Sequence, residues 1–287
     1  MIRIALPNKG RLSETALELF ATAGLKAEFT SERALVAQLG PDIEAIFVRA
    51  ADIPEYVADH AADLGLTGAD LVAEAGRDVT ELLDLGFGRC RLAVAVPDAS
   101  PIQSPADVPG GSRVATSFPG ITRRFFEEQG IDIEIARVSG ATEIAPHLGV
   151  AEVIVDLVST GSTLRVNRLR EVGTIMESTA RVVADPEVME HAEKEGKVRE
   201  VITALESVLR ARKLRYLMAN VRRDQLDEVR TVIPGINGPT IVEIADDEGW
   251  VAAHAVVDAD KVYQTIARLK ELGAEGILLT RIERLMP

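Results

Sequence analysis

Residues 153–164 read VIVDLVSTGSTL, an apolar strand-like run that passes through an acid into a loop of Ser, Thr and Gly opening a helix. Such a segment offers several backbone N–H groups, four hydroxyls and a helix N-terminus together, which suits a phosphate monoester. Gly161 has no Cβ, so the backbone can approach a ligand closely. Asp156 can accept hydrogen bonds from sugar hydroxyls. These features predict a phosphate site.

The same residues also suit a purely structural turn. Thr160 or Ser162 would then only cap a helix, and Asp156 would lie in the turn before it. A Walker-type loop is excluded, because no Lys follows the Gly.

Strand-like and helix-like segments alternate around this stretch from the N-terminus to about residue 180, which predicts parallel sheets with helices on both faces. Ser13 is expected to cap the first helix, with Lys9 and Arg11 in the loop before it. The turn-rich segments 97–101 and 109–111 predict that this part is split into two lobes around a cleft. The expected strands are 2–6, 43–48, 63–66, 92–96, 113–116, 131–138 and 153–158.

The character changes at Asp185, which is expected to cap a long amphipathic helix ending in the basic run 210–213. The remaining residues predict the order βαββαβ, typical of a small ferredoxin-like domain with both helices on one face of an antiparallel sheet. Its expected strands are 214–221, 240–244, 250–257 and 276–282, with a turn at 246–249. Its expected helices are 224–232 and one that Asp258 caps.

Composition limits the function further. Acids outnumber bases 45 to 32, a net charge of −13, which argues against nucleic acid or an anionic membrane as the main partner. The single cysteine, Cys90, excludes an intrachain disulfide and suits the reducing cytosol. No apolar run approaches the ~18 residues that span a bilayer, and the chain opens directly on a strand, so a cytoplasmic protein is expected.

Covalent and zinc chemistry have no sequence signal. No Gly-x-Ser-x-Gly elbow is present, and Cys90 has no motif around it. The four histidines are scattered, without the paired spacing of a zinc site: His60, His147, His191 and His254.

In combination, several segments resemble the ATP phosphoribosyltransferases, which catalyse the first step of histidine biosynthesis. The segments that carry the resemblance are 143–146 with Gly149, 156–158, 160–164, 7–12 and 65–70. It extends to 239–241 and 250–252, which look like the regulatory module of the long form of that family. Glu152 departs mildly, since the family often has Asp there.

The resemblance implies two periplasmic-binding-protein-like catalytic lobes followed by an ACT-like, ferredoxin-like regulatory domain. Lobe I would comprise 1–90 and 175–212 with the connecting helix, lobe II 91–174, and the regulatory domain 213–287. Residues 156–164, here called the phosphate loop, would bind phosphoribosyl pyrophosphate (PRPP), with Asp156 on the ribose hydroxyls. The 5-phosphate would be held by Ser159, Thr160, Gly161, Ser162 and Thr163, with Leu164 beside them.

From the opposite lobe, the resemblance implies that Gly10, Leu12 and Asp70 bind substrate and that three cations are catalytic: Lys9, Arg11 and Arg49. These cations follow predicted strand ends, where open α/β sheets place ligands. Without the resemblance, each would equally suit a solvated surface. Any metal is expected to be Mg²⁺, held through substrate phosphates.

The implied reaction is attack of adenine N1 on C1 of PRPP, with loss of pyrophosphate and inversion at C1. The implied assembly is a homohexamer with dimeric units, inhibited by histidine and by AMP as a competitor. The residues expected near histidine are Asn220, Thr240, Val256 and Ala274.

Two other functions remain open on the residues alone. A solute-binding protein also has two lobes around a cleft, but it would need an export segment and has no need of the C-terminal domain. A free-standing amino-acid sensor would use only that last domain, and it would leave the phosphate loop unexplained.

Overall fold

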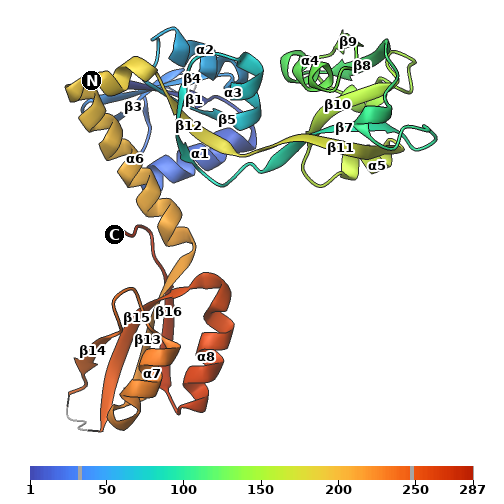
Figure 1. Cartoon of the computed structure of the whole chain (residues 1–287). Helices are drawn as coiled ribbons and strands as arrows, with labels where there is room; N and C mark the ends of the chain where they lie inside the picture. The colour runs from blue at the N-terminus through green and yellow to red at the C-terminus, as the bar shows by residue number, and fades with distance from the viewer. Residues whose placement is uncertain (32–33, 246–248, 287) are drawn as a thin grey trace. The chain divides into compact units, whose positions relative to one another are not determined.

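The computed structural model describes residues 1–31, 34–245 and 249–286 of the chain. The chain divides into two compact units, Met1–Glu18 with Ala27–Arg199 (unit 1) and Leu19–Lys26 with Glu200–Pro287 (unit 2). Unit 1 holds two sheets and unit 2 holds one (Figure 1). No helix within the described residues is long and apolar enough to cross a membrane.

The first sheet of unit 1, here lobe I, has seven strands in the order β2-β3-β4-β1-β5-β12-β6. Its central strands β4, β1 and β5 are parallel, whereas β12 pairs antiparallel with both β5 and β6. The strands are β1 (Ile2–Pro7), β2 (Glu28–Phe29), β3 (Val36–Gly40), β4 (Ile43–Val48), β5 (Leu64–Gly68), β6 (Thr80–Asp84) and β12 (Ala180–Ala184). The helices are α1 (Gly10–Thr22), α2 (Ile53–Ala58), α3 (Ala69–Ala75) and the 3₁₀ helix Ala50–Asp52.

The second sheet, here lobe II, has five strands in the order β11-β7-β10-β8-β9. Strands β10, β8 and β9 are parallel neighbours, and β7 pairs antiparallel with β10 and β11. The strands are β7 (Cys90–Pro97), β8 (Ser112–Thr116), β9 (Ile133–Arg137), β10 (Val153–Val158) and β11 (Leu169–Ser178). The helices are α4 (Pro119–Glu128), α5 (Ser162–Val166) and the 3₁₀ helices Pro105–Asp107 and Thr142–Ile144.

Unit 1 has two α/β lobes as expected, but both sheets are mixed: the pairs of β1 with β4 and β5 and of β8 with β9 and β10 are parallel, and those of β7 and β12 are antiparallel. Strand β7 contains the apolar run 92–96, which is buried as predicted yet pairs antiparallel on both sides. An unbroken apolar run reports burial of both faces of a strand and carries no information on the direction of its neighbours. The sequence pattern predicts none of the strands β2, β3, β6, β11 and β12.

Three helix starts also differ from the expectation, and one of them is that of the last helix: Asp258 instead precedes the 3₁₀ helix Ala259–Lys261, and its side chain makes no cap hydrogen bond. Helix α1 begins at Gly10, where φ is +79°, so Arg11 lies in its first turn and Ser13 lies inside the helix, buried. Asp185 does cap, accepting from the backbone N of Glu187 at 2.9 Å, but the helix it caps is the short 3₁₀ helix Pro186–Glu190. The long helix α6 (Ala192–Arg212) starts afterwards and ends with Arg210 and Arg212 in its last turn, as predicted.

The chain crosses between the two sheets of unit 1 twice, through residues 85–89 and through Ser178 and Thr179. Ser178 Oγ donates to Asp70 Oδ1 at 2.5 Å and accepts from the Asp70 backbone N at 3.1 Å. Thr179 Oγ1 donates to Asp84 Oδ1 at 2.8 Å. Ala180 N donates to the carbonyl of Phe87 at 2.9 Å, so the crossings are bonded to each other and to lobe I.

A second connection within unit 1 joins helix α3 of lobe I to helix α4 of lobe II. The Glu74 carboxylate accepts from the backbone N–H groups of Gly120 and Ile121 at 2.8 and 2.9 Å. Arg124 donates in return to the carbonyl of Ala73 at 2.6 Å. A carboxylate at the N-terminus of α4 satisfies two orphan donors and complements the helix dipole.

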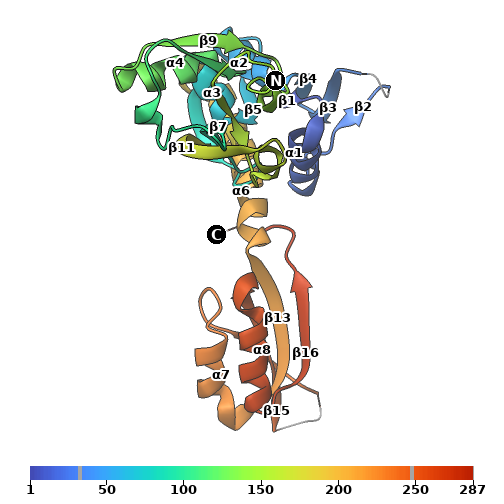
Figure 2. The ribbon, with the colours of Figure 1, turned by 90° about the vertical axis from the view of Figure 1, so that its right-hand side faces the viewer.

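Unit 2 contains the predicted βαββαβ domain, with an antiparallel sheet in the order β14-β15-β13-β16. Figure 2 shows both helices on one face of the sheet, as expected. The elements are β13 (Leu214–Arg222), 3₁₀ Arg223–Gln225, α7 (Leu226–Val232), β14 (Thr240–Glu243), β15 (Trp250–Asp258), 3₁₀ Ala259–Lys261, α8 (Val262–Glu271) and β16 (Glu275–Arg281). Most of the expected turn 246–249 lies outside the described residues.

One ion pair of lobe I makes stability depend on pH. His60 Nδ1 lies 2.7 Å from Asp185 Oδ2, and this hydrogen bond, together with the Asp185 charge, raises the pKa of His60 above its ordinary 6.5. The protonated ring therefore stabilises the fold fully below about pH 6.5, and the contribution is lost as pH rises through the raised pKa.

We predict that His60→Asn loses more stability relative to the wild type at pH 6 than at pH 8.5. Asn tolerates the positive φ of 58° at this position, so the change tests the charge rather than the backbone. Urea unfolding at several pH values measures the difference, with exposed His191→Asn as the control. A constant difference across this range would contradict the prediction.

Candidate functional site

Two cavities of unit 1 border both the phosphate loop and Arg11 of lobe I. The larger, of about 670 Å³, is lined from lobe I by Arg11, Leu12 and Asp70 and from lobe II by Leu157 and Ser159. The smaller, of about 470 Å³, is lined by Arg11, Glu143 and residues 156–164. Arg11 therefore faces both cavities, which places one cation of lobe I against the loop of lobe II.

The phosphate loop departs from a regular helix cap at Gly161. This residue has φ +71°, a conformation that favours glycine, and a Cβ built there would lie 3.3 Å from Arg165 Nη1 at the end of an exposed side chain. Thr160 Oγ1 lies 3.0 Å from Ser162 Oγ and accepts from Ser162 N at 3.4 Å. The hydroxyls of this loop are thus gathered on an exposed turn.

Helix α5, which follows the loop, has only five residues, so its dipole adds little and hydroxyls and backbone N–H groups supply the polarity. Ser162 and Thr163, in its first turn, are exposed beside the smaller cavity. Leu164 is buried in an apolar cluster of lobe II. Its side chain therefore packs the loop onto the sheet, and only its backbone remains available to a ligand.

Asp156 lies near the end of β10 with one oxygen accepting from the backbone N of Leu157 at 2.8 Å. Burial raises the pKa of this carboxyl above its ordinary value, and the charge of Glu143 acts in the same direction. A carboxylate with little solvation and a like charge nearby gains from hydroxyl donors or a cation. The position is suited to a polyhydroxylated ligand.

The opposite wall is built at the carboxyl ends of three neighbouring parallel strands. Lys9, Arg49 and Asp70 follow β1, β4 and β5, and Asn8 N bonds to the carbonyl of Val48 at 2.8 Å. Lys9 and Arg49 are exposed there. In the part of the chain that the structure describes, Lys9, Gly10 and Arg49 do not line either of the two cavities. The structure therefore brings Arg11, Leu12 and Asp70 to a cavity that the phosphate loop also lines. Lys9, Gly10 and Arg49 lie outside that cavity, at the same edge of the lobe I sheet.

Asp70 already has partners in the protein. Its side chain is buried and bonded to Ser178, and a Cβ at Gly68 would lie 2.2 Å from Asp70 Oδ1. Burial raises the pKa of the neighbouring Cys90 thiol, with the Asp70 charge adding to the effect, so the thiol is a poor nucleophile. Asp70, which lines the larger cavity, is thus hydrogen-bonded to the crossing at Ser178.

Some residues of the site escaped the sequence reasoning. Thr142 lowers the pKa of Asp156 against the effect of burial, and Glu143 lines the smaller cavity. Arg91 forms an ion pair with Glu171 and donates to the carbonyl of Ser159 in the loop. Glu143 belongs to segment 143–146, which contributes only to the family resemblance and does not by itself indicate a binding residue. Arg91 and Glu171 are 80 positions apart, and bulges in β11 shift their register, so no sequence pattern pairs them.

Comparison with known proteins gives a consistent result. Residues 49–207 match the family model described as ATP phosphoribosyltransferase (HisG), and residues 211–284 match the model of its C-terminal domain. The ATP phosphoribosyltransferase of Gemmatimonas aurantiaca is 58% identical over 293 residues, covering 100% of both chains. That of Methanopyrus kandleri is 51% identical over 289 residues, also covering 100% of both.

Among solved structures, the ATP phosphoribosyl transferase (HisG:HisZ) complex from Thermotoga maritima is similar at a TM-score of 0.64. Its identity to this chain is 28%, and the match covers 72% of this chain and 99% of that one.

The packing around Asp70 generates a prediction. Gly68→Ala would drive a methyl group into Asp70 Oδ1, so we expect a loss of about 1–3 kcal/mol in the free energy of unfolding, the usual cost of overpacking. Gly110→Ala is the matched control, because nothing lies within 4 Å of its Cβ position. Urea titration of both variants decides the matter, and equal stability of the two would show that the Asp70–Ser178 contact yields without cost.

Proposed function

The chain belongs to the ATP phosphoribosyltransferase family, pentosyltransferases of the first step of histidine biosynthesis, and on this basis we propose how its residues share the reaction. ATP and PRPP meet in the cavities of unit 1, adenine N1 attacks C1 of PRPP, and pyrophosphate leaves with inversion at C1. The observation that carries this assignment is Arg11, which lines both the larger cavity and the cavity at the phosphate loop.

The phosphate loop holds PRPP in this proposal. Backbone N–H groups of residues 159–163 and the hydroxyls of Ser159, Thr160, Ser162 and Thr163 bind the 5-phosphate. Asp156 accepts from the ribose hydroxyls, and the raised pKa of its poorly solvated carboxyl fits a site that is completed by the sugar. Fixing the ribose in this way aligns C1 with the incoming base.

Arg11 stabilises charge as pyrophosphate departs, since it reaches both cavities from the first turn of α1. The triphosphate of ATP is assigned to Lys9, Gly10 and Arg49, which lie at the same edge of the lobe I sheet. Leu12 lines the larger cavity, which is assigned to ATP. Asp70 contributes indirectly, through the crossing at Ser178.

Mg²⁺ is proposed as the cofactor. The donor set fits an ion held mainly by substrate phosphates, since no group of three or more His, Cys, Asp or Glu side chains among the described residues is arranged to hold a metal. Asp156 and Glu143 are the carboxylates that line the smaller cavity and would supply any protein ligand. When bound, Mg²⁺ would neutralise charge on the leaving pyrophosphate.

Histidine is proposed to bind unit 2 as a feedback inhibitor. Asn220, Thr240 and Val256 lie on the face of the sheet that α7 and α8 leave uncovered, as strand alternation and the pairs Thr240–His254 and Tyr216–Val256 require. Ala274 instead lies in the core between sheet and helices, so its side chain cannot contact a ligand on that face. Histidine must favour a low-activity state to inhibit.

The assembly is proposed to be a homohexamer built from dimeric units, with AMP competing at the ATP cavity. Exposed apolar residues on the helix-free face of unit 2, Val242 and Leu278, support burial of that face between subunits. The net charge of −13 and the single cysteine support a cytoplasmic protein without a nucleic-acid or membrane partner.

Thr163→Val tests the phosphate loop. Loss of a hydroxyl bonded to a charged phosphate should weaken PRPP binding roughly ten- to a hundredfold, with ATP affinity and melting temperature nearly unchanged. Titration with PRPP, beside an assay of ATP- and PRPP-dependent pyrophosphate release, measures this. Thr231→Val on α7 is the control, because its hydroxyl bonds within its own helix. Unchanged PRPP affinity would mean that Thr163 only forms part of the first turn of α5.

Trp250, the sole tryptophan, reports on the regulatory proposal because it lies on β15 beside the proposed site. Histidine should change its fluorescence saturably in the full chain and lower turnover, roughly five- to 150-fold at saturation. Asn220→Ala should weaken histidine binding without affecting turnover in its absence. The regulatory assignment is wrong if the wild type shows no saturable response, or if Asn220→Ala binds histidine as the wild type does.

A further inference from the structure

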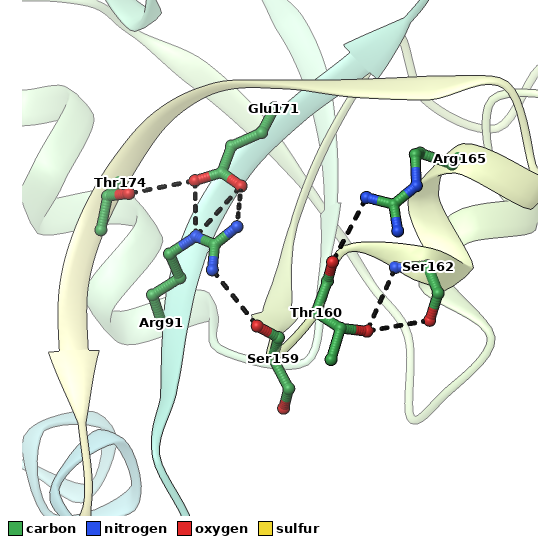
Figure 3. Close-up of polar contacts among 7 residues, drawn as sticks. All are labelled: Arg91, Ser159, Thr160, Ser162, Arg165, Glu171 and Thr174. Atoms are coloured by element: carbon green, nitrogen blue, oxygen red, sulfur yellow. Dashed lines mark hydrogen bonds and ion pairs between the residues drawn. The ribbon is translucent and has the colours of Figure 1, made fainter.

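An ion pair supports the phosphate loop from outside the proposed substrate cavities. A separate cavity of about 420 Å³ borders the loop at Thr160 and Gly161, and its walls include Arg91, Arg165 and Glu171. Figure 3 shows these side chains grouped around the loop. None of the three lines either of the two cavities assigned to the substrates.

Arg91 is held in one orientation by Glu171. Its Nε lies 2.8 and 3.1 Å from the two carboxylate oxygens, and its Nη2 lies 2.6 Å from Oε2. Thr174 Oγ1 donates to the same carboxylate at 3.1 Å, and the hydrogen bond from Arg91 lowers the pKa of Glu171. A bidentate pair of this kind fixes the plane of the guanidinium.

The remaining nitrogen of that guanidinium reaches the loop. Arg91 Nη1 donates to the carbonyl of Ser159 at 3.4 Å, and Arg165 Nη1 donates to the carbonyl of Thr160 at 3.3 Å. Two consecutive carbonyls of the loop are therefore each turned toward an arginine (Figure 3). Both contacts are long, so they act through orientation and charge rather than as strong individual bonds.

The orientation of a carbonyl determines that of the next amide. In a planar trans peptide the C=O of one residue and the N–H of the next point in opposite directions, and no described peptide bond is cis. The N–H groups of Thr160 and Gly161 must therefore point away from the two arginines. A cation on the carbonyl also polarises the peptide and strengthens its N–H as a donor.

We propose that Arg91, oriented by Glu171 and assisted by Arg165, is a positioning residue that turns the amides of Thr160 and Gly161 toward the bound phosphate. The inference rests on the proposed function and extends it to residues outside the substrate cavities. Arg91 contacts the loop at the carbonyl of Ser159 and lines neither substrate cavity, so the pair acts on PRPP through the backbone rather than as a direct cation. Thr160 and Gly161 do not line the larger cavity, which is assigned to ATP, so ATP binding should be insensitive to this pair.

Arg91→Met in the full chain is the test, with separate titrations of PRPP and ATP. We expect PRPP affinity to fall roughly tenfold or more, ATP affinity to stay within about twofold, and KM for PRPP to rise more than kcat falls. Glu171→Gln should give the same selective loss to a smaller extent. The matched control is Arg113→Met, which breaks an ion pair with Glu134 in the same sheet but away from the loop.

Retained PRPP affinity in a folded Arg91→Met protein would overturn the inference, and so would equal losses for PRPP and ATP, which indicate general loosening of lobe II. If Arg91→Met does not fold, Glu171→Gln decides: a selective loss of PRPP affinity supports the role and an unchanged affinity overturns it. Absence of PRPP binding in the wild type would instead overturn the proposed function, and the inference with it.

Discussion

The two crossings between the sheets of unit 1 are the constraint on which the site depends. Ser178 and Thr179 bond to Asp70 and Asp84, two carboxylates that belong to lobe I. Asp70 is buried, so removing the Ser178 hydroxyl would leave the buried Asp70 carboxylate without this hydrogen-bond donor, which is costly. Because the Asp70–Ser178 hydrogen bond joins the two lobes beside the larger cavity, Arg11 of lobe I and Ser159 of lobe II can line the same space.

An acidic chain that binds two polyanions must confine its positive charge. Several arginines of unit 1 are paired with acids, among them Arg77 with Glu55 and Asp59, and Arg181 with Asp84. The phosphate loop itself contributes hydroxyls and backbone N–H groups rather than net charge. This division leaves Arg11 as a local cation at both cavities while the protein as a whole carries a charge of −13.

In unit 2 the alternation of strand residues separates a core from a face that the helices leave uncovered. Leu217, Ala219 and Val221 turn toward α7 and α8, so Asn220 between them turns away. Tyr216 and His254 share the outer face and are bonded to each other at 2.8 Å. The same alternation leaves one face of this small sheet available to the proposed effector while the other face forms a compact core.

Local signals in the sequence determined much of this protein. The strand, acid, loop and helix of residues 153–164 and the order βαββαβ of the last domain depend on periodicity and turn residues within a few positions of each other. The candidate residues on the phosphate loop followed from the same local pattern. The family resemblance added Arg11, Leu12 and Asp70, which the structure brings to the cavities.

Only the tertiary structure decided the features that join distant residues. The antiparallel directions of β7 and β12 depend on which strands they meet across the sheet, and the start of α1 at Gly10 depends on how the chain leaves β1. Asp70 and Ser178 are 108 positions apart, and Arg91 and Glu171 are 80 apart. No local periodicity encodes such pairs, because their partners become neighbours only when the strands have found their register.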